Sequence, residues 1–166
     1  LGVVAGTPDG YSSALFYAIV YVLMSMVSFG ILLALSRAGF DCEKLEDLKG
    51  LNSRNSWYAF LMLLSMFSMA GIPPLAGFYA KFAVIKSVVD IHLYWLAVVS
   101  VMMSLIGAFY YLRVVKHIYF DDVQDNSEIV VRADMKLVLS VNALALLVLG
   151  VLPERLVALC VEAMKQ

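Results

Sequence analysis

The sequence predicts an all-α fold: a polytopic transmembrane helix bundle with one discontinuous helix and about four passes. Of the 166 residues, 63% are hydrophobic and 15% are charged, whereas about a quarter of a typical soluble domain is charged. Residues 10–36, 55–80 and 91–112 contain no Asp, Glu, Lys or Arg. Each stretch exceeds the roughly 20 residues that a helix needs to cross the hydrocarbon core. We therefore expect residues 1–166 to form a single membrane-embedded region.

The first pass is expected over residues 12–36, after a polar start. A polar loop, residues 37–55, follows with four basic and four acidic side chains, and residues 43–47 are expected to form a short surface helix within it. Trp57 and its neighbours then place aromatic rings where a membrane interface favours them. The next helix is expected to begin at this point.

The second helical segment is expected over residues 56–90, with a break at 71–77. Pro73 and Pro74 remove two amide donors and disfavour a helical residue before them, so the helix cannot continue through them. Two interpretations remain open: one broken pass, or two separate passes. One pass of about 35 helical residues would be roughly 50 Å long at 1.5 Å per residue, so it requires an unwound break, a tilt or a protrusion.

Two further helices and a tail complete the expected bundle. We expect helices at 94–117 and 136–152, separated by an acidic loop. In the tail, 153–166, apolar residues recur at helical spacing, which is typical of an amphipathic helix on a membrane surface.

The distribution of basic residues favours one broken pass. Eight of the ten Lys and Arg residues outside 56–90 lie in or beside the loops 37–55 and 117–135, and these two loops share a side only if 56–90 crosses once. The positive-inside rule then makes both loops cytoplasmic. Two separate passes would put the loops on opposite sides and lose this asymmetry.

Lys81 is the main candidate for a functional residue. It lies in an apolar segment seven residues after Pro74, where a lysine costs about 2.5 to 3.5 kcal/mol on insertion scales. One interpretation is that its ammonium reaches the lipid headgroups. The other is that Lys81 exchanges protons, since burial favours the neutral amine and makes the charge sensitive to its neighbours.

The predicted break strengthens the second interpretation. Unpaired backbone groups at membrane depth are tolerated only inside protein or beside a hydrated cavity, and discontinuous helices recur at midplane ion sites in transporters. Gly71, Pro73, Pro74 and Gly77 are therefore expected to mark a hydrated ion path that Lys81 faces.

Other polar residues are weaker candidates. Lys86 precedes Asp90 by four residues, so an ion pair along the helix explains it. His92 titrates near neutrality and could relay protons, although a histidine at a helix end is usually solvated. Hydroxyl and amide side chains could hold water or bond between helices, but small polar residues in spanning helices more often serve packing. These residues are Ser65, Ser68, Tyr79, Ser100, Ser104 and Asn142.

Several function classes receive no support from the sequence. The net charge of −1 gives no basic surface for nucleic acid. Cys42 and Cys160 show no metal-binding or disulfide spacing. Nucleotide-binding, hydrolase and zinc-protease motifs are missing, so we expect neither a cofactor nor a metal in this chain.

Three stretches carry a family resemblance: GTPDGYSSALFYAIVYVLMSMVSFG, SMFSMAGIPPLAGFYAKFAVIKSVV and SLIGAFYYLRVVKHIYF. Together they closely resemble the C-terminal part of the subunit N family of proton-pumping NADH:quinone oxidoreductase, respiratory complex I. The G-I-P-P-x-x-G-F-x-x-K core is also similar to sister antiporter-like subunits and to Mrp-type cation/proton antiporters.

The resemblance implies a role for this region in proton translocation. By the motif, the family's lysine in the broken helix corresponds to Lys81, which would pass protons to or from one side of the membrane. The resemblance further implies a bacterial inner (plasma) membrane location, one pass over 56–90, the C-terminus outside, and other membrane-arm subunits of complex I as partners. The resemblance also implies that other subunits of the complex bind NADH, FMN, iron-sulfur clusters and quinone. Because the family's first repeat is absent here, this chain alone is not expected to complete a proton path.

Three hypotheses follow for the parent protein. It is a proton-translocating subunit of the oxidoreductase, an Mrp-type antiporter subunit, or a structural module in which Lys81 is paired but does not exchange protons.

Overall fold

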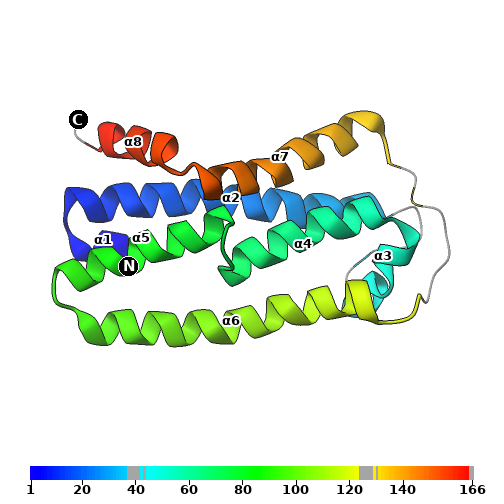
Figure 1. Ribbon diagram of the computed structural model, residues 1–166, viewed down its shortest axis with the longest axis horizontal. Helices are drawn as coiled ribbons and strands as arrows, with labels where there is room; N and C mark the ends of the chain where they lie inside the picture. The colour runs from blue at the N-terminus through cyan, green and yellow to red at the C-terminus, as the bar shows by residue number, and fades with distance from the viewer. Residues whose placement is uncertain (37–41, 43, 124–128, 130, 165–166) are drawn as a thin grey trace.

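The computed structural model describes residues 1–36, 42, 44–123, 129 and 131–164, and these residues form helices joined by turns, with no strand among them. The all-α prediction is thereby confirmed. Figure 1 shows an elongated bundle in which the long helices run roughly side by side. Its helices are α1 (Gly2–Ala5), α2 (Pro8–Leu35), η1 (Leu45–Leu48), α3 (Leu51–Arg54), α4 (Ser56–Ala70), α5 (Ala76–Asp90), α6 (Tyr94–Phe120), α7 (Ala133–Val151) and α8 (Glu154–Ala163). By length and composition, α2, α6 and α7 can each cross a membrane.

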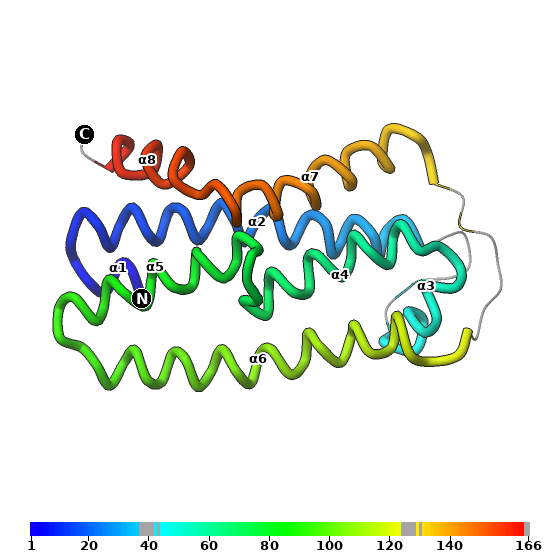
Figure 2. Tube along the Cα trace, in the orientation of Figure 1, coloured from blue at the N-terminus to red at the C-terminus, as the bar shows by residue number. Residues whose placement is uncertain are grey.

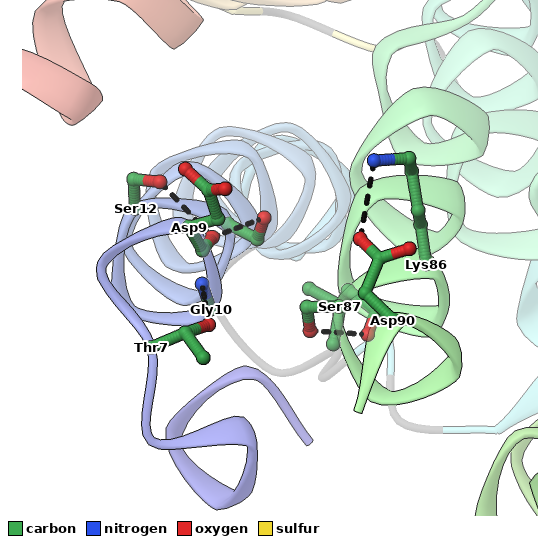
Figure 3. Close-up of polar contacts among 9 residues, drawn as sticks. Thr7, Asp9, Gly10, Ser12, Lys86, Ser87 and Asp90 are labelled. Carbon is green, nitrogen blue, oxygen red and sulfur yellow. Dashed lines mark hydrogen bonds and ion pairs between the residues drawn. The ribbon is translucent and has the colours of Figure 1, made fainter. Parts of the chain in front are cut away.

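Helix α2 begins four residues before the expected position because its first turn is capped. Thr7 is the N-cap, and its hydroxyl accepts a hydrogen bond from the Gly10 amide at 3.0 Å, as Figure 3 shows. Pro8 follows at the first helical position, where its missing amide hydrogen is no loss. The polar start therefore forms the beginning of the helix instead of preceding it.

Helices α4 and α5 are the two halves of one interrupted helix. The helix stops at Ala70 and resumes at Ala76, and Figure 2 shows the two halves in line with a short irregular segment between them. Helix α2 contacts both halves on one side and α6 contacts both on the other. One broken segment thus runs the length of the bundle, as the charge distribution favours.

The segments before α4 and after α6 meet at one end of the bundle. The amide of Gly50 donates a hydrogen bond to the carbonyl of His117 at 3.0 Å, and η1 and α3 both contact α6. Helix α6 extends three residues beyond the expected end at 117, and Asp121 caps it in an extended conformation. Helix α7 starts at Ala133, three residues earlier than expected, with Asp134 in its first turn, where an acidic side chain is favourable.

The C-terminal helix α8 lies beside the start of α2 (Figure 1). Cys160 is buried, and Leu156 and Val157 pack against the core. Of the apolar stripe expected in the tail, 153–166, Leu156 and Cys160 therefore pack inward beside α2, whereas Leu159 is 61% exposed. The location of the tail at a membrane surface stays a prediction.

The core lies between α2, α4 and α7, whereas α6 is largely exposed. Val20, Val27 and Ile31 of α2 are fully buried. On α6, Met102, Leu105 and their neighbours stay exposed along most of the helix. A continuous apolar surface of this extent is typical of a face that contacts lipid or other protein.

Candidate functional site

Helix α4 ends in a left-handed glycine, and this ending satisfies two of its last four carbonyl groups. Gly71 has φ 86°, a conformation that side chains disfavour. Its amide donates to the carbonyls of Phe67 and Ser68 at 3.0 Å, and the Ile72 amide donates to that of Phe67 at 2.9 Å. This is the Schellman arrangement. Among the described residues, no backbone donor bonds to the carbonyls of Met69 and Ala70.

Lys81 supplies the donor for both remaining carbonyls. Its Nζ lies 2.8 Å from the Met69 oxygen and 3.3 Å from the Ala70 oxygen. The side chain of Lys81 reaches back from α5 over Gly71. A Cβ added at Gly71 would lie 3.2 Å from the Lys81 Cδ. Lys81 therefore caps the C-terminal end of α4, where the helix dipole and the unpaired carbonyls favour a cation.

Ser104 of α6 is the third partner of Lys81. Its hydroxyl oxygen lies 2.8 Å from Nζ, and Lys81 is half-buried. Among the described residues, no carboxylate lies within ion-pair distance of this amine. Within this described part of the chain, dipoles and not a counter-charge therefore balance the charge of Lys81.

This set of three partners fits both protonation states of a lysine. An ammonium group has three N–H donors, which the two carbonyls and the Ser104 oxygen can accept. A neutral amine has two N–H groups for the carbonyls of Met69 and Ala70, and a lone pair that can accept from the Ser104 hydroxyl. The rotation of one hydroxyl hydrogen thus separates the two hydrogen-bonding patterns.

The start of α5 is tied to the end of α4 by Ser68. The Ser68 hydroxyl accepts a hydrogen bond from the buried Gly77 amide at 3.0 Å, which satisfies one of the free donors of the first turn. A side chain at Gly77 would overlap the Ser68 carbonyl oxygen. Gly77 therefore belongs to α5, and the break is shorter than the expected 71–77 because this contact allows the helix to resume at Ala76.

A cavity of about 460 Å³ adjoins the site. Lys81 and Ser104 line it together with three tyrosines, Tyr17, Tyr21 and Tyr111. A second cavity of about 400 Å³ shares Tyr21 and Tyr111 as lining residues and reaches the loop end of the bundle. Both spaces are large enough for several water molecules.

Two predicted supporting residues lie on the surface, apart from Lys81. Lys86 pairs with Asp90 at 3.1 Å, and both side chains are exposed. Figure 3 shows this contact along α5. His92 has φ 63° in the turn between α5 and α6, and its Nδ1 lies 2.8 Å from the hydroxyl of Tyr94.

Two others support packing between helices. Tyr79 makes an edge-to-face contact with Phe16 of α2. Ser65 is fully buried, donates to the Met24 carbonyl at 2.8 Å and lies 2.7 Å from the Ser28 hydroxyl. These contacts join α4 and α5 to α2 without reaching Lys81.

Sequence reasoning missed the most direct partners of Lys81. Backbone carbonyls at Met69 and Ala70 have no side-chain signature. Two sequence features together could have indicated them. Gly71 ends the helix, so the turn before it has free carbonyls, and Lys81 is a donor close enough along the chain to reach them. The three cavity tyrosines come from two helices whose facing sides the sequence does not fix.

These features define the class as a polytopic membrane protein built around an interrupted helix with a lysine at the interruption. The family model described as "NADH:quinone oxidoreductase/Mrp antiporter, TM" matches residues 1–107. The chain belongs to this family of membrane proteins.

Individual relatives agree with this assignment and with the resemblance to subunit N. NADH-quinone oxidoreductase subunit N of Laribacter hongkongensis is 64% identical over 100% of this chain and 35% of its own length. The subunit N of Thiobacillus denitrificans is 56% identical over 98% of this chain and 34% of its own length. The chain therefore spans about a third of the length of these relatives.

Solved membrane complexes contain the same fold. A chain of respiratory complex I from Thermus thermophilus superposes with a TM-score of 0.80 at 26% identity, covering 91% of this chain and 35% of that one. A chain of the Mrp complex from Dietzia sp. superposes with a TM-score of 0.83 at 22% identity, covering 99% of this chain and 39% of that one. The second likeness concerns the fold alone.

Proposed function

We propose that the parent protein translocates protons as a membrane-arm subunit of bacterial NADH:quinone oxidoreductase, and that Lys81 exchanges those protons at the break between α4 and α5. The identities of 50–64% to relatives named subunit N favour this complex. The observation that supports the role of Lys81 is its set of three neutral partners, which satisfies the amine with or without its third proton.

In this proposal, quinone reduction elsewhere in the complex changes the charges near Lys81. A positive charge brought close would favour release of the Lys81 proton, and its withdrawal would favour uptake. The rotating Ser104 hydroxyl would keep the amine paired in each state. Water in the adjoining cavity would carry the proton away from the break, because a bound lysine cannot itself move far.

The remaining expectations belong to the same proposal. The parent protein would lie in the bacterial inner membrane, with the loops 37–55 and 117–135 cytoplasmic and the C-terminus outside. Its partners would be other membrane-arm subunits, and other subunits of the complex would bind NADH, FMN, iron-sulfur clusters and quinone. Redox chemistry would take place in those subunits, while this chain would contribute proton transfer.

An Mrp-type antiporter subunit is the second candidate, favoured by the shared fold. An antiporter exchanges ions down a gradient without electron transfer. Ion exchange by the purified parent protein in vesicles without NADH would therefore support the antiporter, whereas exchange that needs NADH turnover would support the oxidoreductase.

A purely structural role for Lys81 is the third candidate, because capping α4 needs only N–H donors. Lys81→Arg separates this role from proton exchange. Arginine keeps the donors but does not lose its charge in proteins. If Lys81 only caps the helix, the Arg variant in the full complex pumps nearly as well as the wild type.

The experiment measures NADH-driven proton pumping in reconstituted vesicles for Lys81→Arg and Lys81→Met. The matched control is Lys86→Arg, the same change on the same helix at an exposed ion pair. We expect both Lys81 variants to lose most of the pumping, with the control unchanged. Wild-type pumping by Lys81→Met would refute the proposal.

A further inference from the structure

The last turn of α7 packs directly against the break. At Gly150, an added Cβ would lie 2.5 Å from the Leu75 carbonyl carbon and 2.6 Å from the Ala76 nitrogen, and it would overlap the Pro74 carbonyl oxygen. All three are backbone atoms, which cannot rotate away as a side chain can. Figures 1 and 2 show the end of α7 reaching the irregular segment between α4 and α5.

The backbone conformation of Gly150 does not require a glycine. Among the described glycines, only Gly6, Gly50 and Gly71 have positive φ, so Gly150 has an ordinary helical conformation. A glycine inside a helix is less favourable than an alanine. What glycine provides at this position is therefore space for the backbone of residues 74–76.

Helix α7 is packed against its neighbours and ends one residue after Gly150. Ala143 and Leu146 are fully buried, which anchors α7 against its neighbours. The helix ends at Val151, and Pro153 separates it from α8. The end of α7 is thus a rigid surface against which the first residues of α5 pack.

The position of these residues sets the geometry of Lys81. Leu75 is the N-cap of α5, and Lys81 lies six residues further along the same rigid helix. Its Nζ must reach across the break to the Met69 carbonyl on α4. A shift of the start of α5 relative to the end of α4 therefore changes that distance directly.

We propose that Gly150 is a positioning residue for proton transfer. Because it has no side chain, α7 can pack directly against the backbone of residues 74–76 and fix the start of α5 relative to the end of α4. Lys81 then stays within hydrogen-bond distance of the end of α4. This inference rests on the proposed function of Lys81. The three atoms nearest to a Cβ added at Gly150 belong to the backbone of residues 74–76, and Gly150 acts through this backbone.

The test uses Gly150→Ala in the complete complex. The added methyl group would overlap the 74–76 backbone, so we expect the start of α5 to shift and at least one hydrogen bond of Lys81 to lengthen. We expect the rate of NADH-driven pumping to fall about tenfold, the change that follows from loss of one charge-assisted hydrogen bond, and its pH profile to shift. The matched control is Gly30→Ala at the contact between α2 and α7, where the new methyl group meets the flexible end of the Leu139 side chain. The control should pump normally.

A double variant separates this inference from the proposed function. If Gly150 acts through Lys81, then Gly150→Ala causes no further loss in the Lys81→Met background. Independent, multiplying losses would overturn the positioning role, as would normal pumping and an unchanged pH profile in the single Gly150→Ala variant. Normal pumping by Lys81→Met alone would refute the proposed function instead.

A measurement on the wild-type complex covers the case in which Gly150→Ala does not assemble. Solid-state NMR on protein labelled with ¹³C at Gly150 Cα and ¹⁵N at Ala76 reports their separation in lipid. We expect van der Waals contact, about 4 Å. A separation too long for contact overturns the inference.

Discussion

Ser68 and Gly77 join the two halves of the interrupted helix, since the Ser68 hydroxyl at the end of α4 accepts a hydrogen bond from the Gly77 amide at the start of α5, at 3.0 Å. Both residues are buried. In the described part, the other side-chain hydrogen bonds between α4 and α5 are those of Lys81. The stability of the break therefore depends on very few contacts.

Replacing Ser68 by Ala leaves the Gly77 amide buried without an acceptor. We expect the local free energy of opening at the start of α5 to fall by about 1 to 3 kcal/mol. Hydrogen exchange of the Gly77 and Phe78 amides measures this quantity. Ser87→Ala is the control, because the Ser87 hydroxyl bonds only within α5, to the Val84 carbonyl. Equal exchange in the two variants would contradict the prediction.

Replacing Ser104 by Ala removes the one partner of Lys81 that can both donate and accept. We expect NADH-driven pumping to fall about tenfold, as for the loss of a hydrogen bond to a charged group, while Ser104→Thr, which keeps the hydroxyl, retains most of it. Ser100→Ala, one turn away, removes a hydroxyl that bonds to the Leu96 carbonyl of its own helix. A larger loss in Ser100→Ala than in Ser104→Ala would argue against the assigned role of Ser104.

The sequence was sufficient to predict the class of fold and part of the candidate site. The tandem prolines after an uncharged stretch place the start of the break correctly, since the break was expected from residue 71 and α4 ends at Ala70. This part is predictable because proline removes backbone donors whatever its surroundings. The predicted end of the break at Gly77 was wrong, because the Ser68 hydroxyl accepts a hydrogen bond from the Gly77 amide and α5 already begins at Ala76. Contacts of that kind depend on packing between segments, which residue patterns do not encode.

The early start of α2 and the position of α8 show the same limit. The polar residues before α2 were expected to precede the helix, yet Thr7 caps it and Pro8 opens it. The apolar stripe of α8 was recognised from its spacing, but the spacing could not show that Cys160 is buried while Leu159 stays exposed.

Cys42 is predicted to be unreactive at neutral pH. Burial raises the pKa of its thiol to about 11, and the charge of Asp47 adds to this effect. Roughly one thiol in a thousand is then ionised at pH 8, and only the thiolate reacts with alkylating agents. We expect alkylation of Cys42, followed by mass spectrometry, to be slow at pH 8 and to rise about tenfold per pH unit toward pH 10. An introduced Ser53→Cys at an exposed position of the same loop is the reference, and equal rates at pH 8 would contradict the prediction.

Asp121 is predicted to stabilise the loop end of the bundle in a pH-dependent way. A hydrogen bond from the His117 side chain, 2.5 Å from Nδ1 to Oδ2, lowers the pKa of Asp121. A carboxyl group whose pKa is lower in the folded state contributes stability above its unfolded pKa, about 3.9, and this contribution is lost as the pH falls through the folded value.

Hydrogen exchange of the Gly50 amide, which donates to the His117 carbonyl, reports on this contact. We expect faster exchange in Asp121→Asn than in the wild type at pH 7, and a smaller difference below the folded pKa of Asp121. Asp122→Asn is the control for the loss of one negative charge. Identical exchange in Asp121→Asn and Asp122→Asn would show that the His117 contact does not hold the loop end together.

The most direct test of the central claim is the position of the Lys81 side chain in a high-resolution density map of the assembled complex. The account predicts that Nζ lies within hydrogen-bond distance of the Met69 carbonyl and the Ser104 hydroxyl, with ordered water in the adjoining cavity. A Lys81 side chain that extends to the lipid headgroups, or a dry cavity filled by apolar side chains, would contradict it.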